Sequence, residues 1–279
     1  MGTPEWLLSG FGDEIDADPV VQLAVLAALG ARYVEVRSAW GVNVIDLAAE
    51  QLDALAHLLA RRDMRVSAIA SPIGKVNAYD DPAAEYARFE RAVAAAHRLD
   101  AGSIRLFSFY RPAGVPVGEI RDPVLRQLGA FAALAEREGL VLVHENEKDI
   151  YGDVPARVLD VVESIGSPAL QVAWDNANFV QCGVRPFTDG YALLRPYLEY
   201  LQVKDAVAAT GEVVPAGDGD GELRETIAAL RDDGYAGFAS LEPHLALQHG
   251  LGGFSGPAEF GRAARAFAAL TTELGVRLR

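Results

Sequence analysis

Two carboxylates two residues apart follow an apolar run in the middle of the chain. The sequence from Val141 to Lys148 reads VLVHENEK. Because side chains alternate along a strand, Glu145 and Glu147 share one face, while His144 points the other way. We expect His144 to face the helical layer as a structural, hydrogen-bonded histidine. A carboxylate beside a core strand is costly unless a cation or a proton meets it. This run therefore indicates a metal site or a proton-transfer site at the end of a strand.

The same pattern recurs later in the chain. Asp175, Gln202 and Glu242 each stand at the end of a further apolar run. In a closed barrel, the C-terminal ends of the strands converge on one cavity, and the alternation allows all four side chains to point inward. Carboxylate and amide oxygens suit a hard divalent ion. We therefore expect Glu145, Asp175, Gln202 and Glu242 to bind Mn²⁺ or Mg²⁺; the alternative is that each acid is a solvated loop residue.

Apolar runs alternate with longer helical patterns along the whole chain. The predicted strands are Trp6–Phe11, Tyr33–Arg37, Arg65–Ala70, Ser103–Phe109, Val141–Glu145, Leu170–Asp175, Tyr200–Lys204 and Phe238–Glu242. The predicted helices are Pro19–Leu29, Leu47–Arg61, Pro82–Leu99, Pro123–Arg137, Pro155–Ile165, Phe187–Tyr197, Glu222–Arg231 and Pro257–Leu274. This order predicts an α/β fold, a single (β/α)8 TIM barrel over residues 1–279. The main alternative, a doubly wound open sheet, would need fewer units or a second domain at this length.

Local signals support the positions of the helices. Asp18 and Asp81 precede prolines at predicted helix starts, so both are expected N-caps. The long loop 205–221 follows the seventh predicted strand, on the side of a barrel where active sites form.

Composition restricts the class of partner and the compartment. The net charge is −14, from 39 acidic and 25 basic residues, which disfavours nucleic acid and anionic lipid as partners. The single cysteine, Cys182, is compatible with a reducing compartment. The first residues lack the pattern of a signal peptide, and no apolar run reaches the roughly 18 residues of a membrane span. We expect a cytoplasmic protein with no membrane segment.

Several segments resemble a known family. HENEKDIYGD (144–153), WDNANF (174–179), VKDA (203–206), GDGDG (217–221) and SLEPH (240–244) look like the sugar phosphate isomerase/epimerase family. These are xylose-isomerase-like barrels, a group that includes ketose 3-epimerases. GFGDEI (10–15), VEVRS (34–38), SPIGK (71–75) and RLFSFY (105–110) match as well. The resemblance covers nearly the whole chain; it is specific for the fold and the position of the site, and weak for the substrate.

The resemblance implies one divalent metal ion held by Glu, Asp, His and Glu at successive strand ends. Glu145, Asp175 and Glu242 match three of these ligands. Gln202 stands where the family has histidine, two residues before Lys204. A glutamine carbonyl binds a hard ion more weakly than a site with imidazole. Three outcomes remain open: a weaker Mn²⁺ or Mg²⁺ site, which we favour, a different geometry, or a site without metal.

The resemblance also implies an activity. It predicts an isomerase or epimerase that moves a proton next to a carbonyl of a ketose or related sugar through an ene-diolate, with Glu145 and Glu242 as the acid/base pair. A purely structural role for these ligands is the alternative. Two other hypotheses keep the barrel: a lyase that eliminates from 3-keto-sugars at the same metal site, and a non-catalytic sugar-binding barrel. A nuclease like endonuclease IV is disfavoured by the five histidines and the negative charge.

Further polar residues are candidates for substrate contact. Lys204 shares a face with Gln202, and pairing with Asp205 is its structural alternative. As a substrate contact, Lys204 suits an anionic or hydroxylated group. Arg105 suits a substrate carboxylate or phosphate, and an ion pair with Glu35 is its alternative. The expected substrate-binding residues are Glu35, Arg37, Lys75, Arg105, Glu147, Tyr151, Asn178, Lys204 and His244. We expect a small carbohydrate as the substrate, and a homo-oligomer is compatible with the sequence.

Overall fold

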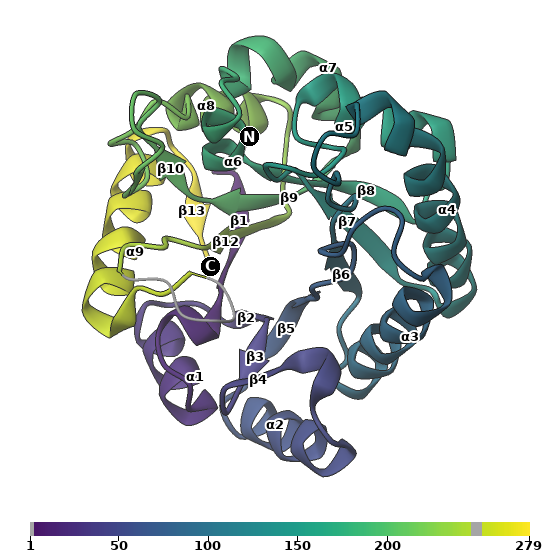
Figure 1. Cartoon of the computed structure of the whole chain (residues 1–279). Helices are drawn as coiled ribbons and strands as arrows, with labels where there is room; N and C mark the ends of the chain where they lie inside the picture. Colours follow the sequence, from purple (N-terminus) through teal and green to yellow (C-terminus); the bar gives the residue numbers. More distant parts are fainter. Residues whose placement is uncertain (1–2, 247–252) are drawn as a thin grey trace.

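The computed structural model describes residues 3–246 and 253–279, and its centre is a closed ring of parallel strands (Figure 1). Around the ring the order is β1, β12, β9, β8, β7, β6, β5 and β2. Parallel bridging of Phe11 to Glu35 brings β2 back to β1. The bounds are β1 Glu5–Gly10, β2 Tyr33–Val36, β5 Arg65–Ala70, β6 Ser103–Leu106, β7 Val141–Glu145, β8 Leu170–Asp175, β9 Leu198–Val203 and β12 Phe238–Leu241. The predicted (β/α)8 barrel is confirmed.

Helices cover the outside of the ring, as Figure 1 shows. They are α1 Pro19–Ala28, α2 Ala49–Arg61, α3 Pro82–Arg98, α4 Arg121–Glu138, α5 Pro155–Ile165, α8 Leu223–Asp232 and α9 Gly256–Glu273. Each corresponds to a predicted helix within two residues at either end. Asp18 and Asp81 act as the predicted N-caps, accepting hydrogen bonds from the backbone N–H groups of Val20 and Ala83 at 2.8 and 3.0 Å. None of the described helices is long and apolar enough to cross a bilayer.

The chain between β8 and β9 differs from the prediction. In place of one helix from Phe187 to Tyr197, it forms α6 (Asn176–Gln181), a π-helical turn (Pro186–Tyr191), α7 (Ala192–Leu194) and a 3₁₀ turn (Arg195–Tyr197). Pro196 lies inside the segment that was predicted as one helix. It has no backbone N–H to continue an α-helical series of hydrogen bonds, and the segment therefore ends as a 3₁₀ turn.

Among the described residues, five short strands of two residues each stand apart from the eight strands of the ring. β3 (Ser38–Ala39) pairs with β4 (Val42–Asn43), and β10 (Asp205–Ala206) pairs with β11 (Val213–Val214) inside the predicted loop 205–221. β13 (Arg277–Leu278) adds a parallel strand beside β1. The sequence did not predict these elements, because two-residue strands leave no periodic pattern to detect.

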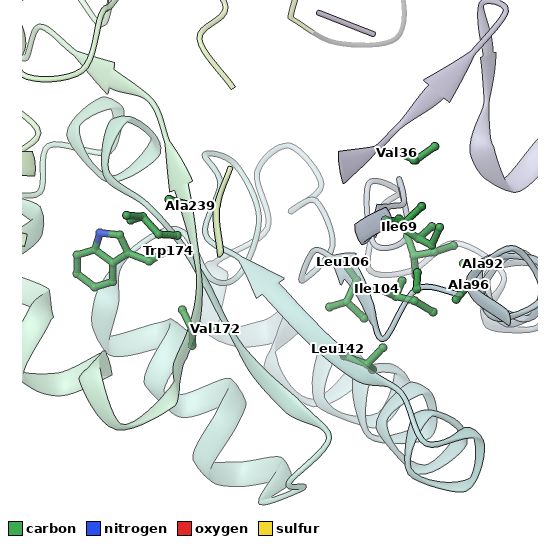
Figure 2. Packing of buried hydrophobic residues seen from close by; sticks show 14 of the residues in the cluster. Val36, Ile69, Ala92, Ala96, Ile104, Leu106, Leu142, Val172, Trp174 and Ala239 are labelled. Carbon is green, nitrogen blue, oxygen red and sulfur yellow. The ribbon is translucent and has the colours of Figure 1, made fainter. Parts of the chain in front are cut away.

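The main hydrophobic core lies between the ring and the helices. Figure 2 shows Ile69, Ile104 and Leu106 of the sheet facing Ala92 and Ala96 of α3. All five side chains are fully buried. Small alanines on α3 let the helix approach the strands closely, which is the packing that fixes the strands in place.

The interior of the barrel is small and partly polar. Its apolar part consists of Ala68, Val143, Ala173 and Tyr200. The Tyr200 hydroxyl lies 2.8 Å from Ser67 Oγ and donates to Glu35 at 3.0 Å. This layer closes the barrel beneath the C-terminal strand ends, so the polar side chains above it face a cavity with a sealed floor.

Candidate active site

The C-terminal strand ends surround a cavity of about 70 Å³. Its lining includes Arg37, Asn43, Ala70, Pro72, Lys75, Arg105, Glu145, Glu147, Lys204, Glu242 and His244. Two larger hollows, of about 510 and 420 Å³, lie on the outer surface against α9 and between α3 and α4. Neither of these outer hollows brings two carboxylates together among its lining residues. The cavity at the strand ends is therefore the candidate active site.

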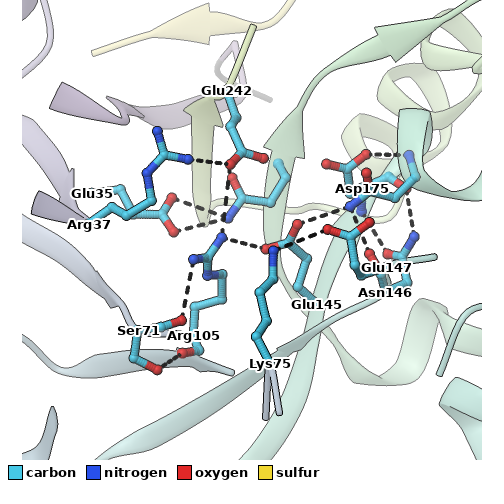
Figure 3. Close-up of polar contacts among 12 residues, drawn as sticks. Glu35, Arg37, Ser71, Lys75, Arg105, Glu145, Asn146, Glu147, Asp175 and Glu242 are labelled. Atoms are coloured by element: carbon cyan, nitrogen blue, oxygen red, sulfur yellow. Dashed lines mark hydrogen bonds and ion pairs between the residues drawn. The ribbon is translucent and has the colours of Figure 1, made fainter. Parts of the chain in front are cut away.

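Three buried carboxylates converge at this cavity. Glu145 ends β7, Asp175 ends β8, and Glu242 follows β12; one oxygen of each lies within 4.8 Å of the others. Figure 3 shows them pointing toward one another from separate strands. We call these three residues the carboxylate cluster. The strand alternation in the sequence allowed all three to point inward, and the structure brings them together.

Lys204 supplies a positive charge inside the carboxylate cluster. Its ammonium lies 2.9 Å from Asp175 Oδ2 and 3.0 Å from Glu242 Oε2, and the side chain is 3% exposed. Burial alone would lower the pKa of Lys204, but Asp175 and Glu242 hold it well above its usual value. The expected alternative partner, Asp205, is occupied elsewhere: it accepts from the backbone N–H groups of Gly217, Gly219 and Gly221.

Arg105 and Asn178 hold Glu145 from two sides. Arg105 donates to Glu145 Oε2 at 2.8 Å, and the Asn178 amide donates to Oε1 at 3.0 Å. Asn178 is positioned in turn because Asp175 caps α6, accepting from the Asn178 backbone N–H at 2.8 Å. Burial raises the pKa of Glu145, and the charge of Arg105 offsets part of that rise. Glu35 is therefore not the main partner of Arg105.

Glu242 faces more positive charge than Glu145 does. Arg37 donates to its Oε1 at 3.3 Å, Lys204 donates to Oε2 at 3.0 Å, and His244 Nε2 lies 3.3 Å from Oε1. Burial would raise the pKa of Glu242, but Lys204, His244 and Arg105 hold it well below its usual value. By contrast, burial raises the pKa of Asp175 to about 7, although Lys204 opposes the shift. The carboxyl groups of one cluster thus have different proton affinities.

Gln202 lies in the same layer and faces Glu35. Strand register places it beside Asp175 on β8 and Ser240 on β12. Its amide nitrogen lies 3.0 and 3.2 Å from the two oxygens of Glu35. Burial raises the pKa of Glu35 to about 7, and Arg105 lowers it in part. The Gln202 Oε1 atom is buried and has no hydrogen-bond partner among the residues that the structure describes.

Glu14 is a site residue that the sequence did not reveal. It lies in the 3₁₀ turn after β1 (Gly12–Glu14), and its side chain is fully buried. Glu14 Oε2 accepts from the backbone N–H of His244 at 2.9 Å and from the Ser255 hydroxyl at 2.8 Å. Burial raises the pKa of Glu14, against the influence of His244 and Arg37. Its GDEI context is a clue to a turn, but nothing local indicates a partner more than 200 residues away.

Two more residues that the sequence did not reveal hold these groups in place. Asp13 Oδ2 accepts from Arg37 Nε at 2.8 Å and so orients the guanidinium toward Glu242. Asn146 links β7 to β8: its amide donates to the Asp175 carbonyl, and its Oδ1 accepts from the Asp175 backbone N–H, both at 2.9 Å.

The other predicted contact residues divide between the rim and the outside. Lys75 pairs with Glu147 at 3.2 Å on the rim, and its ammonium stacks 4.2 Å from the Phe107 ring centre. Tyr151 instead donates its hydroxyl at 2.6 Å to Asp160 of α5, outside the cavity lining. In this structure Tyr151 therefore contacts and stabilises a helix.

His144 points away from the cavity as predicted, but it is not hydrogen-bonded as expected. Both ring nitrogens are buried without a hydrogen-bond partner among the described residues. Burial lowers the pKa of His144 to about 4, so the ring is neutral at pH 7. A Cβ atom at Gly152 would lie 2.5 Å from the ring, so only glycine fits there.

The donor set is compatible with a divalent metal ion. Around the cavity, acidic groups outnumber basic side chains: Asp13, Glu14, Glu35, Glu145, Glu147, Asp175 and Glu242 against Arg37, Lys75, Arg105 and Lys204, with His244 beside them. Hard carboxylate oxygens are the ligands that such ions prefer. Gln202, the strand-register neighbour of Asp175, carries one more buried oxygen, Oε1, without a hydrogen-bond partner among the described residues. These residues fit a metal, although Lys204 already contacts two of the carboxylates.

Comparisons with known proteins agree with this architecture. A family model described as a xylose isomerase-like TIM barrel matches residues 23–269. A stretch of 99 residues is 35% identical to 2-epi-5-epi-valiolone 7-phosphate 2-epimerase of an Actinoplanes species. The match covers 36% of this chain and 35% of that protein, which is about a third of the relative's length.

Solved structures show the same fold at low sequence identity. A D-tagatose 3-epimerase-like protein superposes with a TM-score of 0.79 at 17% identity, over 96% of this chain and 98% of that one. A xylose isomerase-like TIM barrel protein from Mycobacterium smegmatis, in complex with magnesium, gives 0.69 at 18% identity, over 98% of each chain. Because the family model matches most of the sequence, the chain belongs to the family of xylose isomerase-like TIM barrels.

Proposed function

We propose that this protein is a metal-dependent sugar isomerase or epimerase that moves a proton at a carbon next to a carbonyl group. The observation that carries the proposal is the carboxylate cluster, where three acids from separate strands meet in a buried cavity. Such an arrangement is costly to fold and is typical of sites that hold a cation and move protons. The epimerase named among the relatives supports the class of reaction.

The ligands proposed for the metal are Glu145, Asp175, Gln202 and Glu242, with Mn²⁺ or Mg²⁺ as the preferred ion. The three carboxylates are hard donors, and Gln202 offers a buried oxygen that no described residue uses. Magnesium is the ion in the structure of the M. smegmatis relative. Polarisation of a substrate carbonyl is the chemistry that a divalent ion supplies in such a site when bound.

The proposed proton carriers are Glu145 and Glu242. Glu242 is surrounded by Arg37, Lys204 and His244, whose charges favour its ionised form, so it is the base in the resting site. Glu145 has one cationic partner and one amide partner, and it is the group that returns the proton. Reversal of these roles would give the reverse reaction.

The remaining polar side chains define the proposed substrate class. Arg37, Lys75, Glu147 and His244 line the cavity with donors and acceptors that suit the hydroxyl groups of a small carbohydrate. The cavity is small and closed beneath by Tyr200, so we propose a small sugar rather than a polymer as the substrate. The acidic charge of the chain gives no support for nucleic acid as a partner, and we propose a cytoplasmic location.

Isotope exchange tests the proposal directly. Metal-free protein is loaded with Mn²⁺ or Mg²⁺ and incubated in deuterated water with a panel of ketoses and 3-keto-glycosides, and deuterium at carbon is followed by NMR. Glu145→Gln and Glu242→Gln should each reduce exchange at least about 100-fold, since each removes a proton carrier. Glu90→Gln, on the exposed side of α3, is the matched control and should exchange at the wild-type rate. Full exchange in Glu145→Gln or Glu242→Gln would contradict the mechanism, as would the absence of exchange in the wild type with every sugar tested. Loss of a leaving group in place of epimerisation would identify a lyase.

A further inference from the structure

Lys204 occupies part of the space in which the proposed metal would be bound. We propose that its ammonium is the resident counter-ion of the carboxylate cluster, and that a divalent ion enters the site only by displacing it. This inference rests on the proposed metal site and goes beyond it, because it assigns a role to a residue that is not one of the proposed ligands.

The contacts of Lys204 support this role. Its ammonium is within ion-pair distance of two of the three acids, at 2.9 Å from Asp175 and 3.0 Å from Glu242. The side chain is almost fully buried. A buried ammonium must be compensated by opposite charge, and buried carboxylates need the same from a cation. Lys204 therefore compensates the charge of Asp175 and Glu242 without any added ion.

The ammonium and a divalent ion exclude each other at this position. A metal–oxygen bond is about 2.1 Å long, so an ion on either oxygen that Lys204 contacts would lie at most about 5 Å from the ammonium. Like charges at that separation repel strongly where little water screens them. Arg37 and Arg105 already pair with Glu242 and Glu145, so a divalent ion that entered beside Lys204 would join three cationic side chains at the cluster.

The position of Lys204 in the fold allows it to leave. It directly follows β9, whereas the next residue, Asp205, is fixed by the backbone of the glycine-rich loop 217–221. The backbone is thus anchored while the long side chain can rotate. Glu147 lies on the cavity rim close enough for its charge and that of Lys204 to influence each other, and it offers the displaced ammonium another partner.

Two consequences follow for metal binding. The metal-free protein should be folded and stable, because the cluster already has a cation. Metal affinity should also be lower than the carboxylates alone would give, because each binding event must break the two ion pairs of Lys204. Replacing Gln202 and replacing Lys204 would then strengthen metal binding for different reasons, one by adding a better ligand and one by removing a competitor.

Direct binding measurements on metal-free protein test this inference. Mn²⁺ is titrated by calorimetry into the wild type, Lys204→Met and Lys204→Gln, with Lys148→Met as the control. Lys148 is an exposed lysine that does not line the cavity. We expect both Lys204 variants to bind Mn²⁺ about tenfold or more tightly than the wild type, and Lys148→Met to stay within about threefold of it. Without metal, both Lys204 variants should melt at a lower temperature than the wild type, and Mn²⁺ should raise their melting temperatures by more than it raises that of the wild type.

The outcomes separate this inference from the proposed function. Equal or weaker Mn²⁺ binding in folded Lys204→Met or Lys204→Gln overturns the competition between ammonium and metal. If one Lys204 variant does not fold without metal, the Mn²⁺ affinity of the other variant tests the competition. The unfolded variant is then refolded in the presence of Mn²⁺, which should restore its fold. Binding is measured without any sugar, so a failure of isotope exchange would reject the proposed reaction and leave this result intact. Isotope exchange by wild-type protein that binds no Mn²⁺ would contradict the role of the metal in the proposed function and in this inference.

Discussion

Glu14 holds His244 at both its backbone and its side chain. One carboxylate oxygen accepts from the His244 backbone N–H at 2.9 Å, and the other lies 3.1 Å from the imidazole Nε2. The same imidazole nitrogen lies 3.3 Å from Glu242. His244 adopts a φ of 47°, a conformation that non-glycine residues rarely take, so these contacts must hold it there. Glu14 is therefore a positioning residue for the histidine beside the proposed base.

Removing the Glu14 carboxylate should weaken both the fold and the site. Glu14→Ala leaves the His244 N–H and the Ser255 hydroxyl without their acceptor, so we expect a loss of about 3 kcal/mol in the free energy of unfolding. Glu14→Gln keeps an acceptor oxygen and should lose less than half of that. Urea denaturation measures both values, with Ser255→Ala as a comparison that removes the hydroxyl contact with Glu14 and the acceptor of the Leu245 backbone N–H. Equal stability of Glu14→Ala and the wild type would show that these bonds do not hold the segment.

Breaking the buried pair of Arg105 and Glu145 should be strongly destabilising. Arg105→Met leaves the Glu145 carboxylate buried, with the Asn178 amide as its one remaining hydrogen-bond partner among the described residues, and we expect a loss of about 3–5 kcal/mol in the free energy of unfolding. Arg121→Met is the matched control, because Arg121 pairs with Asp160 near the surface, where water screens the charges and such a pair contributes little to stability. Denaturant unfolding curves of the two variants compare the losses. Similar small losses in both would mean that Glu145 is protonated in the native state.

Restoring histidine at position 202 should strengthen metal binding. Gln202→His places an imidazole next to Asp175 in the strand register, and nitrogen donors bind first-row ions such as Mn²⁺ more tightly than an amide oxygen does. We expect about a tenfold lower dissociation constant for Mn²⁺ by calorimetry. Gln171→His, at the opposite end of β8, is the control and should bind as the wild type does. An unchanged affinity in Gln202→His would show that residue 202 is not a ligand.

His144 should make the fold sensitive to acid. Its pKa falls from 6.5 to about 4 on burial, so the unfolded chain binds a proton that the native ring does not. Stability is therefore lost as the pH falls below 6.5 toward 4, by about 2 kcal/mol at pH 5. The glutamine of His144→Gln cannot titrate in this range. Between pH 7 and pH 5, the free energy of unfolding of this variant should therefore fall by about 2 kcal/mol less than that of the wild type. Parallel changes in the wild type and the variant, measured by urea unfolding at both pH values, would exclude this titration as a cause.

The sequence by itself determined the barrel and the location of the site. Strand alternation and helical spacing repeat through the whole chain, and both are local properties that one stretch of sequence contains. Because barrel strands end on the same face, the positions of Glu145, Asp175 and Glu242 at strand ends indicated that these side chains could meet, and the structure brings them together. Only the segment 187–197, with its π-helical and 3₁₀ turns, departed clearly from its predicted helix.

The tertiary structure alone decided which charges face one another. From the sequence, Lys204 could pair with Asp205 or point into the cavity. In the structure the backbone N–H groups of the loop 217–221 bind Asp205, and Lys204 pairs with Asp175 instead. Arg105 could have joined Glu35 but reaches Glu145, and Glu14 meets His244 from the opposite end of the chain. Side-chain pairing over such separations depends on the closure of the barrel and on the competition of several charges for one small buried space. No local pattern records that competition, whose outcome sets the proton affinity of each acid in the site.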